Sequence, residues 1–432
     1  MRTLPTHRPS RSPRSDRRQR VPPALTRGTE RVDGISILDE IGGDLGLLLW
    51  RAGRNVALWA ETPADQRASL FDGGAARNRG DELAASEVHA ELRGPLSVFT
   101  ELLAHPGEVD LLRLVNACRR VALWAEHRGA LATALQFSQA AALTAPESAS
   151  LAYAVGRLAR RRAEYDRAES WYTRAVVQGR QTRDWRSYAL AFSGMGNLHS
   201  QRGNYPAAKR AHLRSLRVAE RKGLPEMVGD AYHGLFAIET EMHAGFEADV
   251  LAERAFIAYG PREPRVKRLA YDVAYHWALL GYFKGAATVA EALVPLFDDA
   301  AERTALLALV GRAAGGLGNR DRFDLALDEA RILLLRASTE EVAAMALLGF
   351  AHGAASLGDS GLSVELATRA ATIASRRSEW RVAMEAEAVA ESARARPSVA
   401  REIPVNPGGE PLHTLADAFV DVLARGLAVA AG

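Results

Sequence analysis

Residues 194–223 read GMGNLHSQRGNYPAAKRAHLRSLRVAERKG, and the spacing of small residues in this stretch decides the fold. Three segments align without gaps: HRGALATALQFSQAA from residue 127, RRAEYDRAESWYTRA from residue 161 and QRGNYPAAKRAHLRS from residue 201. Two helices cross closely only where side chains are small, and the turn between them favours glycine. Small residues therefore predict helix pairs where they recur seven residues before a turn, at the turn, and five and twelve residues after it: Ala122, Gly156, Gly196; Gly129, Ala163, Gly203; Ala134, Ala168, Ala208; Ala141, Ala175, Ser215.

This spacing resembles the tetratricopeptide repeat, a helix-turn-helix unit of 34 residues that stacks into a superhelix. The same anchors place repeat starts near residues 115, 149, 189, 229, 267, 304 and 344, in steps of 34 to 40 residues that resemble the extended variant of bacterial proteins. The resemblance implies an all-α fold, a right-handed α-α superhelical solenoid of tetratricopeptide-like hairpins. It spans residues 111–395, with about seven units and a capping helix at 380–395.

The stretch VALWAE occurs twice, at residues 56–61 and 121–126. The second copy falls in the first helix of the first clear repeat. The first copy lies on an apolar helical stripe that Thr62-Pro63 ends, so we interpret residues 34–110 as an N-terminal helical region with a degenerate repeat. The alternative is chance similarity between two amphipathic helices. Further along, a turn is predicted at residues 72–74 and a helix over residues 81–104, kinked at Gly94-Pro95.

The two ends of the chain differ from its body. Residues 1–33 hold nine arginines against Asp16, Glu30 and Asp33, and few apolar residues, which predicts a disordered basic tail. A nucleic-acid arm is the sharper alternative, although no aromatic is interleaved for base stacking. Residues 396–411 are rich in proline and glycine and are typical of a linker. Residues 412–432 predict a C-terminal helix, favoured as a cap on the open end of the solenoid over a dimerisation or self-inhibiting helix in the groove.

Composition and motifs argue against several classes of protein. Cys118 is the single cysteine, which excludes an intrachain disulfide and a thiolate zinc site. No stretch of 18 apolar residues and no secretory signal is present, so we expect a cytoplasmic protein that does not enter a membrane. Protease, hydrolase and phosphate-loop motifs are missing. We therefore expect neither an enzyme nor a cofactor or metal site.

The resemblance implies a concave groove lined by positions 2, 5, 9, 12 and 13 of each first helix. Tyr153, Arg157, Arg160 and Arg161 follow the spacing i, i+4, i+7, i+8, which puts them on one helix face. Three guanidiniums there would suit a carboxylate or an acidic peptide, and a solvated charged face is the alternative. The candidate groove residues are Asn116, Arg119, His127, Tyr153, Arg157, Arg160, Arg161, Asn197, Gln201, Tyr271 and Tyr275, with Glu126, Arg268 and Arg312 at equivalent positions.

Two hypotheses of function follow from these features. The first is a non-enzymatic scaffold or adaptor that binds a partner protein or peptide, of acidic character, in the groove. The second is a peptide-responsive signalling or transcription-related regulator, similar to bacterial repeat sensors. Residues 34–432 carry a net charge of −3, which counts against nucleic-acid binding except through residues 1–33.

Overall fold

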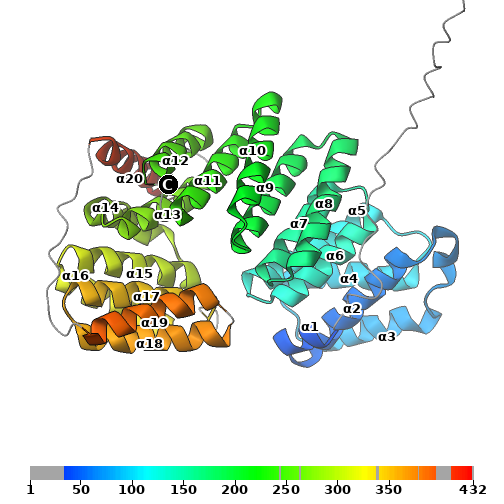
Figure 1. Cartoon of the computed structure of the whole chain (residues 1–432). Helices are drawn as coiled ribbons and strands as arrows, with labels where there is room; N and C mark the ends of the chain where they lie inside the picture. Colours follow the sequence, from blue (N-terminus) through cyan, green and yellow to red (C-terminus); the bar gives the residue numbers. More distant parts are fainter. Residues whose placement is uncertain are drawn as a thin grey trace, which may run out of the picture. The chain divides into compact units, whose positions relative to one another are not determined.

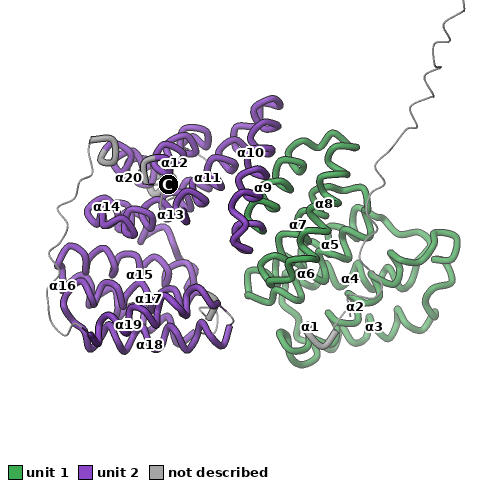
Figure 2. The backbone as a smooth tube through the Cα atoms, in the orientation of Figure 1, with its two compact units in different colours: residues 1–198 green, residues 199–432 purple. Residues whose placement is uncertain are grey.

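The computed structural model describes residues 34–242, 245–261, 264–336, 340–377, 379–395 and 410–430, and each element within these ranges is a helix. The chain divides into two compact units, residues 1–198 and 199–432 (Figures 1 and 2). The expected basic tail at 1–33 and residues 396–409 of the linker expected at 396–411 lie outside the described residues, and α20 begins at Glu410. The all-α prediction is confirmed for the part of the chain that the structure describes.

Unit 1 begins with four helices outside the regular hairpins and continues as paired helices. Helix α2 packs mainly against α6 and α1, whereas α5 pairs with α6 and α7 pairs with α8. The helices are α1 (Gly34–Glu40), α2 (Gly43–Glu61), the 3-10 turn η1 (Ala64–Ser69), α3 (Gly73–Ala85), α4 (Ala90–Ala104), α5 (Leu111–His127), α6 (Leu131–Thr144), α7 (Ala149–Arg161), α8 (Tyr165–Thr182) and α9 (Trp185–Gln201), which runs past residue 198.

Unit 2 is a stack of hairpins in which α11 pairs with α12, α13 with α14, α15 with α16, and α17 with α18. The first helices α15 and α17 also pack directly on each other. The helices are α10 (Tyr205–Lys222), α11 (Pro225–Glu241), α12 (Gly245–Tyr259), α13 (Val266–Leu279), α14 (Phe283–Leu293) with η2 (Val294–Leu296), α15 (Ala300–Gly316), α16 (Arg320–Leu333), α17 (Glu340–Ser356), α18 (Ser360–Arg376), α19 (Trp380–Ala395) and α20 (Glu410–Ala430).

Six of the turns that the structure describes take a left-handed backbone conformation at the position that the repeat spacing predicts. Gly129 has φ +75°, Ala163 +60° and Gly203 +72°, and Gly281, Gly318 and Gly358 repeat this geometry in unit 2. Glycine enters this region without a steric penalty. The predicted repeat starts also fall within α5, α7, α9, α11, α13, α15 and α17, each among the first five residues of its helix.

Small residues also set the distance between helices. A Cβ atom on Gly156 of α7 would lie 2.7 Å from the ring of Tyr172 in α8, and one on Gly194 of α9 would lie 2.5 Å from the same ring. Real Cβ atoms do not approach other atoms so closely, so both positions require glycine. In unit 2 the ring of Phe350 lies against Gly311 in the same way.

The prediction of one helix over residues 81–104 is wrong. Two helices, α3 and α4, occupy this stretch, and they are separated at Ser86, whose backbone is extended. The hydroxyl of Ser86 donates to the carbonyl of Glu82 at 2.7 Å, which satisfies one of the carbonyls that the end of α3 leaves open. Pro95 lies inside α4 and is buried there, so the interruption comes before the proline and not at it.

The expectation that the C-terminal helix caps the open end of the solenoid is also wrong. Helix α20 packs on α14 and α13, and the Phe419 ring meets Phe256 of α12 edge-on at 4.9 Å (Figure 1). Its apolar stripe, Leu415, Ala416, Phe419 and Leu423, is buried. The last hairpin helix α19 packs on α18 and α17. The apolar stripe of α20 is therefore buried against the side of unit 2 that carries the second helices α12 and α14.

We expect Ala163→Gly to raise the free energy of unfolding by about 0.5–1 kcal/mol. Alanine in the left-handed region costs roughly 1–2 kcal/mol, and the larger entropy of glycine in the unfolded chain offsets part of the gain from removing this strain. The measurement is urea unfolding followed by circular dichroism. The matched control is Gly129→Ala at the equivalent turn, which should lower the same quantity. Equal effects of the two variants would contradict this account.

We expect Phe419→Ala to detach α20 from unit 2, since replacing a fully buried phenylalanine with alanine costs about 3–5 kcal/mol. Limited proteolysis should then cleave within α20 while the rest of unit 2 resists, and mean residue ellipticity should fall by the share of the 21 residues of α20. Asp421→Ala, at an exposed position of the same helix, is the control. Resistance of α20 in the Phe419 variant would show that its docking does not depend on this ring.

Candidate functional site

The first helices of unit 1 share a salt-bridged face. The guanidinium of Arg157 in α7 donates to both carboxylate oxygens of Glu126 in α5, at 2.5 and 2.7 Å, and Arg161 donates to Oε1 of the same carboxylate at 2.7 Å. A bidentate pair of this kind fixes the orientation of both groups as well as their distance. The face therefore connects two successive first helices at their polar side chains.

These groups are ionised together. Burial raises the pKa of Glu126, but the hydrogen bonds and charges of Arg157 and Arg161 outweigh burial, so the pKa lies below its usual range. The hydrogen bond to Glu126 raises the pKa of Arg157 against the opposing effect of burial. With Arg160 next in sequence, three positive charges accompany one negative charge, and the cluster keeps a net charge of +2.

Arg160 binds a tyrosine instead of a carboxylate. Its side chain is hydrogen-bonded to Tyr172, whose pKa burial raises to about 12, while its Nε atom is buried without a hydrogen-bond partner among the described residues. The rings of Tyr153 and Tyr172 lie 5.9 Å apart. The arginines of α7 are thus half-buried and held in place, in contrast to a freely solvated face.

The remaining candidates of this face are exposed. Asn116, Arg119 and His127 lie on α5, beside Leu123, whose exposed fraction is 49%. Asn197 lies on α9 within unit 1, and Gln201 lies at the end of α9 beyond it. The structure therefore brings Arg157, Arg161 and Glu126 into contact, with Arg160 and Tyr153 around Tyr172, and leaves the α5 residues as a solvent-facing border.

The first helices of unit 2 carry a second polar face. Nε2 of His233 in α11 lies 2.9 Å from Asp272 in α13, and Arg268 donates to the same carboxylate at 3.1 Å. The pKa of Asp272, which burial alone would raise, is lowered by the hydrogen bond from His233 and by Arg268. Burial raises the pKa of both predicted tyrosines on α13, Tyr271 and Tyr275.

Farther along this face, Arg312 of α15 lies near the Tyr275 hydroxyl and the Glu385 carboxylate of α19. Burial lowers the pKa of Arg312. Nε2 of His352 in α17 lies 3.2 Å from Oε1 of Glu385, which connects α17 to α19. The sequence pattern predicted Arg312 but not Glu385, because Glu385 lies on the helix taken as a cap, to which no groove positions were assigned.

Two acidic residues of unit 2 were also missed. Asp230 accepts a hydrogen bond from the Tyr259 hydroxyl at 2.7 Å and forms an ion pair with Arg265. Asp230 and His233 occupy positions 2 and 5 of the fourth repeat, so the groove rule would have found them there. Asp272 occupies position 6, outside the rule, and no signal in the sequence marks it.

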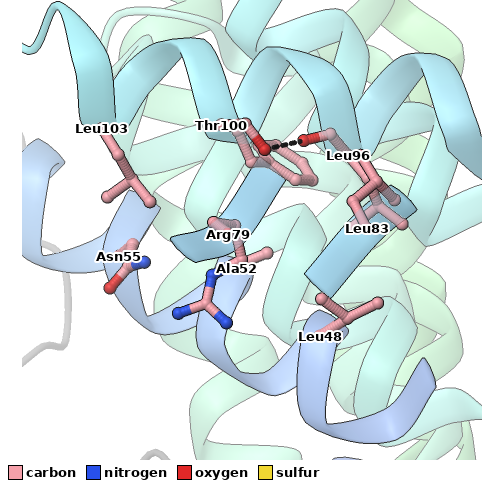
Figure 3. A pocket seen from close by; sticks show the side chains of 9 residues that line it. Leu48, Ala52, Asn55, Arg79, Leu83, Leu96, Thr100 and Leu103 are labelled. Carbon is pink, nitrogen blue, oxygen red and sulfur yellow. Dashed lines mark hydrogen bonds between the residues drawn. The ribbon is translucent and has the colours of Figure 1, made fainter. Parts of the chain in front are cut away.

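A small cavity lies among the first helices of unit 1. The space between α2, α3 and α4 measures about 10 Å³, roughly the room for one water, and apolar side chains surround it together with Arg79 and Asn55 (Figure 3). No cluster of three histidine, cysteine or carboxylate side chains suited to a metal occurs among the described residues. Within the same residues, no helix combines the length and the apolar character needed to cross a membrane.

The fold and these polar faces define a helical-repeat protein whose hairpins present their first helices side by side. The family model described as tetratricopeptide repeat matches residues 150–184, which hold α7, α8 and the left-handed turn at Ala163. The hairpin of α7 and α8 is therefore a tetratricopeptide repeat, as the spacing of small residues predicts. Proteins built from such repeats serve as protein-protein interaction scaffolds.

Solved structures with similar helical arrangements are also found. One is a Rap protein complexed with Competence and Sporulation Factor, with 12% identity, 79% of this chain and 99% of the other covered, and a TM-score of 0.48. Another is a signal-transduction ATPase of Pyrococcus horikoshii with a tetratricopeptide repeat sensor, with 12% identity, 90% and 64% covered, and a TM-score of 0.47. A comparison with curated proteins found no match.

His212 of α10 lies buried beneath the second polar face. Its ring packs against Gly234 of α11, where a Cβ atom would lie 2.1 Å from the imidazole, and neither ring nitrogen has a hydrogen-bond partner among the described residues. Burial, assisted by the nearby His233, lowers the pKa of His212 from 6.5 to about 4. The folded state therefore holds this imidazole neutral.

Since the folded pKa of His212 lies below its unfolded value, its contribution to stability is complete above pH 6.5 and is lost as the pH falls toward 4. We expect the free energy of unfolding of the wild type to fall between pH 7 and pH 5 by roughly 2 kcal/mol more than that of His212→Leu. Urea unfolding at both pH values measures this difference. The exposed His127, changed to glutamine, is the control and should behave as wild type.

Proposed function

We propose that this chain is a non-enzymatic interaction scaffold that binds an acidic segment of a partner protein on the first-helix face of unit 1. The observation that supports the proposal is the pairing of Arg157 and Arg161 with the carboxylate of Glu126, with Arg160 beside them on Tyr172. Half-buried guanidiniums with a net charge of +2 attract carboxylates more strongly than solvated ones, because less water screens them.

The geometry of the cluster favours selective binding. Glu126 and the packing of α7 hold the arginines in one orientation, so a ligand would pay little entropy to order them. Guanidiniums bind carboxylates in a planar, two-point manner that lysines do not reproduce. The exposed Leu123 and the ring of Tyr153 add apolar surface beside the charges. The preferred ligand is therefore a peptide with acidic side chains next to a large apolar residue.

The test replaces the whole charge cluster without leaving an uncompensated charge. In the quadruple variant, Glu126, Arg157, Arg160 and Arg161 are all changed to glutamine, which removes the net charge of +2. We expect affinity capture followed by mass spectrometry to recover a partner with wild type and to lose it with this variant. A peptide from the acidic segment of that partner should bind the variant at least tenfold more weakly in fluorescence anisotropy, and wild-type binding should weaken as salt rises.

The matched control is Arg180→Gln/Arg186→Gln, which removes the same charge from exposed positions on α8 and α9 of unit 1. Circular dichroism should show all variants folded. Equal loss in the control would mean that overall charge, not this face, recruits the partner. If peptide binding also changes the radius of gyration in small-angle scattering, the scaffold acts as the peptide-responsive regulator of the second hypothesis.

A further inference from the structure

A cleft opens in unit 2 between α10, α11 and α12, on the side opposite to the polar face of the first helices. Its volume is about 410 Å³. The side chains that line its floor and walls are apolar or aromatic: Leu213, Leu216, Tyr232, Leu235, Val250 and Leu251. Leu216, Leu235 and Ala231 form a small hydrophobic cluster separate from the main core of the unit. The volume would hold two or three large apolar side chains.

Charged groups surround the cleft. The amine of Lys209 in α10 pairs with Oε1 of Glu239 in α11 at 2.7 Å. Glu247 and Arg254 lie seven residues apart on α12, which puts them on one side of that helix, with Val250 and Leu251 between them. Arg254 lies over the Tyr232 ring at 5.8 Å. An apolar strip with a negative charge at one end and a positive charge at the other thus runs along α12.

The side of α12 opposite to the cleft is already covered by other helices of the unit. Asp249 and Phe256 lie on the side turned away from the cleft, seven residues apart. There Asp249 accepts a hydrogen bond from the Trp277 indole at 2.9 Å, and Phe256 packs on Phe419 of α20. Helix α20, which has large apolar residues at i, i+4 and i+8, therefore packs on α14 and α13 and meets this side of α12 through Phe256.

The cleft is the corresponding position one hairpin earlier, along the second helices α10 and α12. We propose that it is a docking site for an amphipathic helix of a partner protein, which inserts large apolar side chains into the cleft and places a base beside Glu247 and an acid beside Arg254. This is helix-in-groove recognition. The site is distinct from the proposed acidic-segment site, because it lies on another unit and takes most of its lining from the second helices α10 and α12.

The probe for this proposal is a fluorescein-labelled peptide of residues 410–430, because α20 is the apolar helix that this side of unit 2 already accepts. It is titrated with the full chain and followed by fluorescence anisotropy. We expect saturable binding, and we expect Val250→Glu, which puts a carboxylate into the cleft, to weaken it at least tenfold. Leu325→Glu makes the same kind of change on α16 of the same unit, at a side chain with an exposed fraction of 65% outside the cleft, and should leave binding within twofold.

Other outcomes would overturn the proposal. Binding that is weakened by Phe256→Ala but not by Val250→Glu would mean that the peptide only exchanges with α20. The absence of binding at 100-fold excess of chain over peptide would reject a helix as the occupant. Val250→Glu turning a dimer into a monomer in light scattering would assign the cleft to a second copy of the chain. A lipid-like molecule seen by native mass spectrometry and lost from Val250→Glu would assign it to a small ligand.

Discussion

The ring of Tyr172 lies against Gly156 and Gly194, and the rest of unit 1 depends on this absence of side-chain volume. A methyl group at either glycine would push α8 away from α7 or α9. In unit 2 the same packing of an aromatic ring on a glycine occurs at Gly229 with Tyr259, at Gly311 with Phe350 and at Gly316 with Phe283. Close approach of the hairpins is what allows side chains on successive first helices to meet, as Arg157 and Glu126 do.

The sequence correctly predicted those parts of the fold whose local backbone conformation depends on the type of a single residue. A left-handed turn needs glycine or a small residue, and Gly129, Ala163 and Gly203 all adopt it. Two predictions failed for opposite physical reasons. The break at Ser86 has no glycine or proline to mark it, and the bond from the Ser86 hydroxyl to the Glu82 carbonyl is one that serines also form inside helices. The position of α20 depends on Phe256, a contact partner 163 residues before Phe419, and no periodic pattern encodes such a pairing.

The candidate site shows the same division. Helical spacing put Arg157, Arg160 and Arg161 on one face, and the repeat register put Glu126 on the equivalent face of the preceding helix. Their ion pairs depend on the distance between α5 and α7, which packing sets and which sequence spacing does not report. Asp272 lies outside the groove positions altogether, yet it is the carboxylate that His233 and Arg268 share. A rule based on repeat position identifies the residues of the surface, whereas the pairing of their charges depends on how the helices pack.

Helix α12 illustrates why a repeat built on small residues leaves surface to be covered. The side that it packs inside its hairpin carries Ala248, Ala252 and Ala255, which permit close approach but bury little apolar area each. A helix held by alanines gains much of its stability from larger side chains at its two edges. One edge has Phe256 against α20 and Asp249 bound to Trp277. The other edge, with Val250 and Leu251, lines the cleft and is only partly buried, so burying it would stabilise unit 2 and its ligand together.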